Sequence, residues 1–559
     1  MTRHRLLRGH ALSLLGGLLL SLLVYTCAFA QTGSSSVRGT VVDQQGNVVA
    51  GATVTLINAD KNFMRSQVVS DSGAYVFNTV PPGKYRIEAE AKGFKKVMVE
   101  NVNARVDTPT EVTVELEAGN ISESVSVTAG ETAPLNTTDA TIGNTFESRR
   151  IEELPLNARN VVGLLSLQPG VTRGGAVNGG RSDQANITLD GVDVNEQQRG
   201  LDVVTGEAFA SVLRVTPDSV QEFRVITTNA NAEQGRSSGA QVSLVTKSGT
   251  NQFHGVLYEY HRNTATTAND FFNNKAGVER PQLLRNIFGG VVGGPIKHDR
   301  AYFFFSYEGF REATATSSVA TVPLPETLGQ GLVRYVTSST TAGSPCPISG
   351  QPSRRCISLT PAQINAAYTA ANGVTPGVSP AALSLLADIA HRYPANDTTV
   401  GDGINTGGFR FNARTPSQFD TYTAKFDFNL TDRQTLFVRT NYQNDVIGLA
   451  PILPDAAAPQ IWNHPKGLAL GHTWTASKNF INRFTYGLTR LAFTQLGDSD
   501  QNRVSFRFIF DPVPTRTLSR TTPVHNFVDD ISWFKGDHNF QFGANLRLIK
   551  NTRNSFANS

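Results

Sequence analysis

One polar stretch, ANDTTVGDGINTG at residues 395–407, carries the side chains best suited to holding a hard cation. Asp397, Asp402 and Asn405 supply oxygen donors, which Ca²⁺ and similar ions prefer. Their spacing matches no EF-hand loop. The sequence therefore favours a solvated turn over a metal site, and we expect no bound metal.

Two cysteines, Cys346 and Cys356, could form a covalent bond within the segment CPISGQPSRRC. In an exported protein such an even pair predicts a disulfide that closes a small loop. Closure of about ten residues would contribute roughly 2.5–3 kcal/mol at best. Two free thiols are the alternative, and a metal site is disfavoured because no histidine lies within the loop.

The histidines provide no catalytic arrangement. His254 and His261 lie in strand-like sequence without partners, and lone histidines there are usually structural. No Ser/His/Asp set or cluster of metal ligands is evident in the N-terminal domain either. The sequence thus predicts a protein that is not an enzyme and needs no cofactor.

The first 30 residues have the pattern of a secretory signal. MTRHRLLRGH is basic, residues 11–30 are uncharged, and the run ends in Ala-Phe-Ala. We predict cleavage after Ala30. A signal anchor is the alternative, since 20 uncharged residues could span a bilayer. Lipidation at Cys27 is disfavoured because the three residues before it are not small.

Composition points to strands and turns rather than to long helices. Charged residues are only 17% of the 559, whereas soluble domains average about 25%, and there are 49 glycines. Without Arg3, Arg5 and Arg8 the 50 basic residues fall to 47, against 46 acidic ones, so no basic stripe points to nucleic acid. Past residue 30 no apolar run approaches ~18 residues, so insertion in a membrane would require a closed barrel.

Strict alternation in DTYTAKFDFNL, residues 420–430, predicts a strand with one apolar and one polar face. The apolar face could point into a soluble core or toward lipid. Similar strands joined by tight turns follow, at 431–434, 478–479 and 535–537. Strands of roughly ten residues with short turns on one side and long loops on the other are typical of outer-membrane barrels, and aromatic residues near strand ends suit interfacial girdles. These aromatic residues are Tyr422, Tyr442 and Trp533.

Residues 250–559 are therefore predicted to form part of a large antiparallel transmembrane β-barrel. Alternation is lost between about 312 and 416, where one or two short helices are expected. A connection of this length usually carries function. Because the long loops of outer-membrane barrels are extracellular, we place this excursion outside the cell.

Residues 36–118 consist of short alternating segments separated by turn residues, which predicts a β-sandwich. The order GTVVDQQGNVVAGATVTL, SDSGAYVFNTVPPGKYRIEAEAKGF and EVTVEL resembles the carboxypeptidase regulatory-like domain. That resemblance implies a binding or spacer module without catalytic residues.

Residues 141–249 have a mixed pattern, with a helix expected over 148–154 and glycine-rich turns between short strands. A strand ending in Leu189-Asp190-Gly191, the strand VQEFRVIT and a strand ending at Thr246 to Gly249 occur in this order. The block resembles the plug of TonB-dependent outer-membrane receptors. LRNIFGGVVGGPIKHDRAYFFFSYEGFRE, residues 284–312, is similar to the Oar-like branch of that family.

The linker 119–140 contains an isolated β-prone segment suited to pairing with the edge strand of a partner. By its place before the plug it resembles a TonB box, which implies an energy-transducing TonB-type partner on the periplasmic side. The alternative is a last strand of the preceding sandwich. The candidate residues are Ser124, Val125, Ser126, Val127, Thr128 and Ala129.

Taken together, the chain is predicted to be mainly β: a sandwich, a small mixed α/β plug and an incomplete barrel. The resemblance implies an outer-membrane receptor that binds an unidentified external ligand, faces lipid, and admits the ligand to the periplasm by energy-coupled plug displacement. The alternative is a surface carbohydrate-binding or adhesion protein without transport. Loop residues that could contact ligand, or could equally be solvated, are Arg173, Asn178, Arg181 and Asn195.

The number of strands is small for this family. About nine or ten are evident after residue 249, whereas barrels of the family resemble cylinders of 22 strands. We therefore expect the chain to be an N-terminal fragment of a longer protein.

Overall fold

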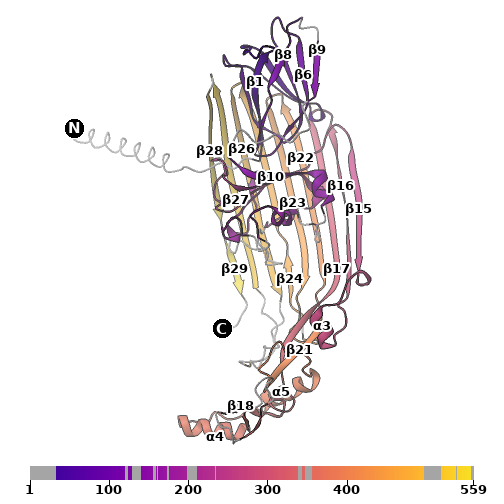
Figure 1. Cartoon of the computed structure of the whole chain (residues 1–559), viewed down its shortest axis with the longest axis vertical. Helices are drawn as coiled ribbons and strands as arrows, with labels where there is room; N and C mark the ends of the chain where they lie inside the picture. The colour runs from indigo at the N-terminus through magenta and orange to yellow at the C-terminus, as the bar shows by residue number, and fades with distance from the viewer. Residues whose placement is uncertain are drawn as a thin grey trace, which may run out of the picture.

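The computed structural model describes residues 33–119, 124–128, 140–154, 159, 161–172, 176–197, 211–232, 234–337, 343–346, 355–456, 458–496, 506, 518–536 and 538–555. A tall curved wall of strands forms the body of the molecule, with the plug lying against it (Figure 1). The N-terminal sandwich lies at one end of the wall and the long excursion at the other.

The sandwich forms because short alternating strands bury one face each. Its two sheets have the orders β4-β1-β7, with β8 beside β1, and β3-β2-β5-β6-β9. Tyr75 and Tyr85 lie in the apolar core, and their hydroxyls donate to Val112 O and Pro81 O at 2.6 Å. The strands are β1 (Ser35–Asp43), β2 (Thr53–Asn58), β3 (Phe63–Val68), β4 (Ala74–Val80), β5 (Gly83–Glu90), β6 (Lys96–Ala104), β7 (Pro109–Glu111), β8 (Val114–Leu116) and β9 (Ser124–Thr128).

Strand β9 is the candidate TonB box, and it lies at the edge of the larger sandwich sheet. It pairs in parallel with β6, from Lys96↔Ser124 to Glu100↔Thr128. Among the described residues β9 pairs with no other strand, so its outer edge is free. This is the arrangement that the sandwich-strand alternative describes. Ala129 lies outside the described residues.

The plug is a five-stranded sheet of order β10-β13-β14-β11-β12. Strands β11 and β14 are buried along their whole length, although polar side chains are interspersed with apolar ones in both. Asp190 and Gly191 link β11 to β12 with φ of 50° and 82°, a two-residue hairpin turn that suits Asp-Gly. The elements are β10 (Ile142–Glu147), α2 (Ser148–Glu153), η2 (Val161–Leu167), η3 (Ser182–Gln184), β11 (Asn186–Leu189), β12 (Val192–Asp193), η4 (Pro217–Ser219), β13 (Val220–Thr228) and β14 (Gln241–Thr246).

The wall is a twelve-stranded antiparallel sheet. Nine strands follow one another across it, and β21, β25 and β29 pair with strands of that path beside one of its members. Within the described residues β15 pairs only with β16 and β28 only with β27, and the sheet is not closed. Its strands are β15 (His254–Asn263), β16 (Leu283–Lys297), β17 (Ala301–Pro323), β21 (Thr406–Arg414), β22 (Ser417–Thr431), β23 (Gln434–Gly448), β24 (Gln460–Asn463), β25 (Lys466–Ser477), β26 (Phe480–Leu496), β27 (Leu518–Lys535), β28 (His538–Ile549) and β29 (Thr552–Ser555).

The two faces of the wall separate as the alternation in DTYTAKFDFNL allows. On β22, Thr421, Thr423 and Lys425 are buried against the plug side, whereas Leu430 on the opposite face is 46% exposed. On β28 the exposed side chains include Phe542 and Leu546. The apolar face therefore points outward and the polar face toward the plug. No helix among the described residues is long and apolar enough to cross a membrane.

The excursion is shorter than the range 312–416 predicted from loss of alternation. Strand β17 continues to Pro323 and pairs with β21 from Ala315↔Arg414 onward. Small and polar residues in ATATSSVATV hide this extension because they give no apolar–polar contrast. Helix α3 (Phe271–Ala276), from the connection between β15 and β16, lies beside the base of the excursion. The excursion itself carries η6 (Leu328–Gln330), β18 (Val333–Thr337), β19 (Ser344–Pro345), β20 (Arg355–Leu359), α4 (Pro361–Asn372) and α5 (Pro380–Arg392).

Candidate functional site

The plug is joined to the wall at the turn between β11 and β12. Asp190 accepts from the Thr246 amide at 3.0 Å and from the Thr246 hydroxyl at 2.8 Å. Lys425 Nζ of β22 lies 3.3 Å from Asp190 Oδ1, and Arg439 Nε of β23 lies 3.1 Å from Oδ2. The carboxyl is 4% exposed and the Arg439 side chain is fully buried. Two wall cations thus converge on one plug carboxylate.

Electrostatics keep the Asp190 carboxyl ionised in this site. Burial acts to raise its pKa, but Lys425, Arg439 and the Thr246 hydrogen bonds outweigh burial and lower it. Lys425 also donates to Thr246 O at 3.1 Å, so the same cation contacts the turn after β11 and the end of β14. The contact is therefore a charged anchor between plug and wall.

A second anchor is built around Arg159 of the plug. Its Nε donates to Glu308 of β17 at 3.0 Å, and its Nη2 pairs closely with Asp218 of the plug. The guanidinium lies over the rings of Tyr258 and Tyr260, 4.7 and 4.6 Å from their centroids. Tyr258 donates to Glu308 at 2.9 Å. Burial raises the pKa of Asp218, with Arg159 acting against the shift.

Three further ion pairs cross between plug and wall. Arg547 of β28 lies 2.6 Å from Asp193, Arg520 of β27 lies 2.7 Å from Glu196, and Arg214 of the plug lies 3.1 Å from Asp445 of β23. The anchors therefore reach wall strands from β17 to β28. Buried pairs of this kind are costly to desolvate, so their role is to fix the position of the plug rather than to add net stability.

Two wall glycines complete the fit by shape. An added Cβ at Gly487 of β26 would lie 2.2 Å from Val192 Cγ1. One at Gly467 of β25 would lie 2.4 Å from Leu213 Cδ1. The absence of side chains at these two positions lets plug side chains reach the wall backbone.

The sandwich contacts the plug through the chain between β6 and β7. The Val106 amide donates to both carboxylate oxygens of Glu222, at 3.0 and 3.1 Å, and Ser243 donates to Asp107 in a short hydrogen bond. Glu222 is 5% exposed. Burial raises its pKa to about 7, against the opposing effect of the Val106 amide.

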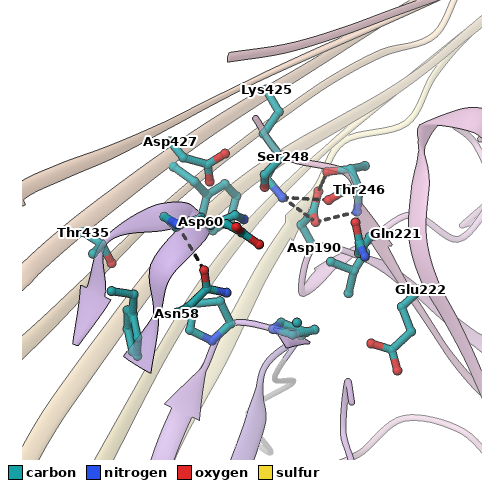
Figure 2. A pocket seen from close by; sticks show the side chains of 18 of the residues that line it. Asn58, Asp60, Asp190, Gln221, Glu222, Thr246, Ser248, Lys425, Asp427 and Thr435 are labelled. Atoms are coloured by element: carbon teal, nitrogen blue, oxygen red, sulfur yellow. Dashed lines mark hydrogen bonds and ion pairs between the residues drawn. The ribbon is translucent and has the colours of Figure 1, made fainter. Parts of the chain in front are cut away.

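A cavity of about 430 Å³ lies where sandwich, plug and wall meet (Figure 2). Asn58 and Asp60 of the sandwich, and Glu222 of the plug, line it together with wall side chains. Lys425 and Asp427 of β22 and Thr435 of β23 project from the wall strands (Figure 2). The lining combines charged side chains of both signs with aromatic and proline side chains, among them Phe63, Pro81 and Phe437.

Docking of the sandwich on the plug is expected to weaken with rising pH. Because the folded pKa of Glu222 lies above its ordinary 4.5, the favourable contribution is complete below about pH 4.5 and is lost as pH rises through about 7. Thermal midpoints measured across this range should fall in the native protein. Glu222→Gln should abolish that fall, by a difference of about 1–3 kcal/mol.

Glu147 provides the matched control, since it lies at the same contact and accepts from Asn103 at 3.0 Å in an exposed position. Glu147→Gln should leave the pH dependence as it is. An unchanged pH profile in Glu222→Gln would contradict the role given to Glu222.

The loop residues predicted to contact ligand are placed as follows. Asn178 is exposed and donates to Thr227 O at 3.0 Å, and Arg181 is exposed beside Asp183. Asn195 is 9% exposed, and its amide donates to Ala185 O and accepts from the Ile187 amide, both at 2.8 Å. Asn195 thus bonds the backbone of the plug and is not the solvated loop residue that the alternative describes. Arg173 lies outside the described residues.

The side chains considered for cation binding serve the backbone of their own loop. Asp402 Oδ1 accepts from the amides of Ile404, Asn405 and Thr406 at 2.8–3.0 Å. Asp397 is paired with Arg410 Nε at 2.6 Å. Within the described residues no group of three or more His, Cys, Asp or Glu side chains is placed to hold a metal.

The remaining predicted groups have structural surroundings. Cys346 and Cys356 form a disulfide with Cα atoms 5.0 Å apart, close to buried Ile404. His261 Nδ1 lies 2.7 Å from Asn286 Oδ1 on the neighbouring strand, and His254 is exposed on β15. The site that the structure assembles is therefore the plug–wall contact, not a catalytic centre.

Comparison with known proteins agrees with this architecture. The family model described as outer membrane beta barrel domain matches residues 245–559, and the model described as carboxypeptidase regulatory-like domain matches residues 36–117. The TonB-dependent transporter Oar of Myxococcus xanthus is 28% identical over 323 residues, which cover 55% of this chain and 29% of that protein.

Solved structures with a similar course of the chain include the outer membrane transporter YddB of Escherichia coli, with a TM-score of 0.46, 14% identity and coverage of 74% of this chain and 48% of that one. A ferric enterobactin receptor mutant of Pseudomonas aeruginosa in complex with enterobactin gives a TM-score of 0.41 at 12% identity, covering 74% and 50%. The chain thus spans less than a third of the curated relative and about half of these structures.

Proposed function

This chain belongs to the outer membrane beta barrel domain family, and on that premise we propose that it is the plug-bearing part of a TonB-dependent receptor that admits an external ligand to the periplasm. It acts as a carrier, not as an enzyme. The observation that carries the proposal is the plug seated on the polar face of the wall by buried ion pairs from β17 to β28.

The mechanism follows from that geometry. A plug held by charged anchors closes the space beside the wall, and moving it requires that several buried pairs separate together. Leaving one partner of a buried pair alone costs about 3–5 kcal/mol, so spontaneous displacement is rare and an external source of energy is needed. A pull applied at the N-terminal side of the plug supplies that energy.

The handle for the pull is the segment of residues 124–129. Strand β9 already has extended geometry and a free outer edge, which suits capture by strand addition from a TonB-type partner in the periplasm. Export with cleavage after Ala30 places this segment in the periplasm. The excursion and the plug loops determine which ligand is bound, and we assign no ligand.

Deleting residues 124–129 tests the proposal. Binding of the purified periplasmic domain of a TonB-type protein should be lost, and so should energy-dependent uptake of whichever ferric-chelate, cobalamin, glycan or peptide probe the native protein accumulates. Surface binding of the same probe should persist, because the outward-facing loops are unchanged.

Deletion of residues 131–136 is the matched control, since it removes six residues from the same linker and leaves the strand intact. It should retain partner binding and uptake. Uptake that survives removal of residues 124–129 would instead favour a surface-binding or adhesion protein.

A further inference from the structure

The sandwich spans the short-turn end of the wall. Its Asp60 carbonyl accepts from the Asn251 amide at 3.0 Å, just before β15. Its Lys61 carbonyl accepts from Asn429 Nδ2 at 2.9 Å, near the end of β22. The contacts therefore begin at the first described wall strand and continue to the middle of the sheet.

The far side of the wall is held by one sandwich side chain. Asn78 Nδ2 donates to Ser532 Oγ of β27 at 2.5 Å and to Asn539 Oδ1 of β28 at 2.8 Å. Asn78 is 5% exposed, so these hydrogen bonds are shielded from water. With Asn251 and Asn429 they place the sandwich across the full width of the described wall, as its position over the strand ends in Figure 1 illustrates.

Behind this seat lies the cavity of about 430 Å³. The plug closes one side of it through Asp190 and Thr246, the wall another through Lys425 and Thr435, and the sandwich the third through Asn58 and the Pro81–Pro82 turn (Figure 2). A solute that passes the plug beside β22 enters a space whose periplasmic side is occupied by the sandwich.

The seat is built to separate. The apolar core of the sandwich is distinct from that of the plug, and the contacts between the bodies are mainly hydrogen bonds from a few side chains. Polar interfaces of this kind allow domains to move relative to each other. Strand β9 belongs to the sandwich sheet, so a force on β9 acts on the sandwich before it reaches the plug.

We propose that the sandwich is a second gate, which closes the periplasmic mouth and must leave its seat before solute passes. The closure stands on the contacts above, whereas the source of the opening force rests on the proposed function. The two are tested separately.

Opening is measured with Thr435→Cys, which lines the cavity, in the protein in its outer membrane and with a small maleimide as probe. Lys478→Cys, on an exposed turn of the same end, reports an always accessible position. At rest Thr435→Cys should react at least about tenfold more slowly than Lys478→Cys, since Thr435 is half-buried beneath the sandwich and becomes fully accessible only when the sandwich moves away. Equal rates at rest would overturn the gate.

A covalent lock tests whether the sandwich is the closing element. Met64 lines a small gap with Arg300 and Asp432 of the rim, so a photoreactive phenylalanine analogue at Met64 links sandwich to wall on irradiation. Irradiation should remove labelling of Thr435→Cys in energised cells, and the unirradiated sample is the control. Labelling that continues in the linked protein would contradict the proposal.

Loosening the seat separates the gate from its driving force. Asn78→Ala combined with Asn429→Ala should raise labelling of Thr435→Cys several-fold even when a protonophore is present. Asn47→Ala, on an exposed sandwich hairpin, should not. If the double substitution raises the labelling rate while the protonophore leaves the labelling rate of the native seat unchanged, the gate is upheld and TonB coupling is overturned. No response to the loosened seat would overturn the gate itself.

Discussion

Asp190→Asn is expected to free the plug from the wall at its central anchor. The change removes the one carboxylate that faces Lys425 at 3.3 Å and Arg439 at 3.1 Å, and it leaves two buried cations without their counter-charge. Removing one partner of a buried pair costs about 3–5 kcal/mol, mostly through the charge left behind. Thermal unfolding of the purified protein should move to lower temperature, and the plug should become sensitive to trypsin.

The shape of the side chain is almost unchanged by this substitution, so the loss isolates charge from packing. Asp183→Asn is the matched control. Asp183 belongs to the same plug and pairs with Arg181, whose side chain is 75% exposed. There the cost should stay below about 1 kcal/mol. Equal effects of the two substitutions would contradict the anchor.

Arg159→Ala is expected to lower the stability of the protein by a similar amount, because it removes a plug cation instead of a plug anion. The guanidinium serves Glu308 of the wall and Asp218 of the plug and stacks on Tyr258 and Tyr260. Its loss leaves two buried carboxylates facing an empty space, a cost of about 3–5 kcal/mol. Raising the pH from about 5 to about 8 should increase the defect, since burial raises the pKa of Asp218 and its carboxyl ionises as the pH rises.

Two further substitutions sharpen this prediction. Arg159→Lys should recover only part of the loss, because the donors of an ammonium all lie on one nitrogen and the group has no planar face to stack on two rings. Arg149→Ala, whose side chain is 89% exposed and pairs with Glu153 one helical turn away, should cost about 0.3–0.5 kcal/mol. Full recovery in Arg159→Lys would mean that charge alone holds this anchor.

Local pattern predicted much of the fold because membrane strands follow a simple rule. The alternation in DTYTAKFDFNL left two orientations open, and the contact of Lys425 with Asp190 selects the one with the apolar face outward. Asp-Gly after Leu189 indicates a turn because these two residue types tolerate positive φ, and both adopt it in the structure. The number of wall strands was predictable because long strands alternate between apolar and polar residues. About nine or ten were expected, and the main path of the described sheet has nine.

The anchors were not readable from local pattern. Arg159 belongs to no helix or strand, and its partner Glu308 is 149 residues away. Lys425 was recognisable only as a polar residue on a wet face. The seat of the sandwich joins Asn78 to residues more than 450 positions later in the chain, and asparagine in a strand gives no sign of such a contact. Contacts of this kind depend on the assembled fold, not on neighbours in sequence.

The side-chain-free positions at Gly467 and Gly487 restrict the path along which the plug can move. Leu213 packs against Gly467 of β25, and Val192 packs against Gly487 of β26. The residues that flank these two glycines along the strands carry side chains. Sliding by two residues along a strand would bring Leu213 and Val192 against the next side chains on the same face of the wall. If the plug moves as the proposed function requires, it must first move away from the strands rather than slide along them.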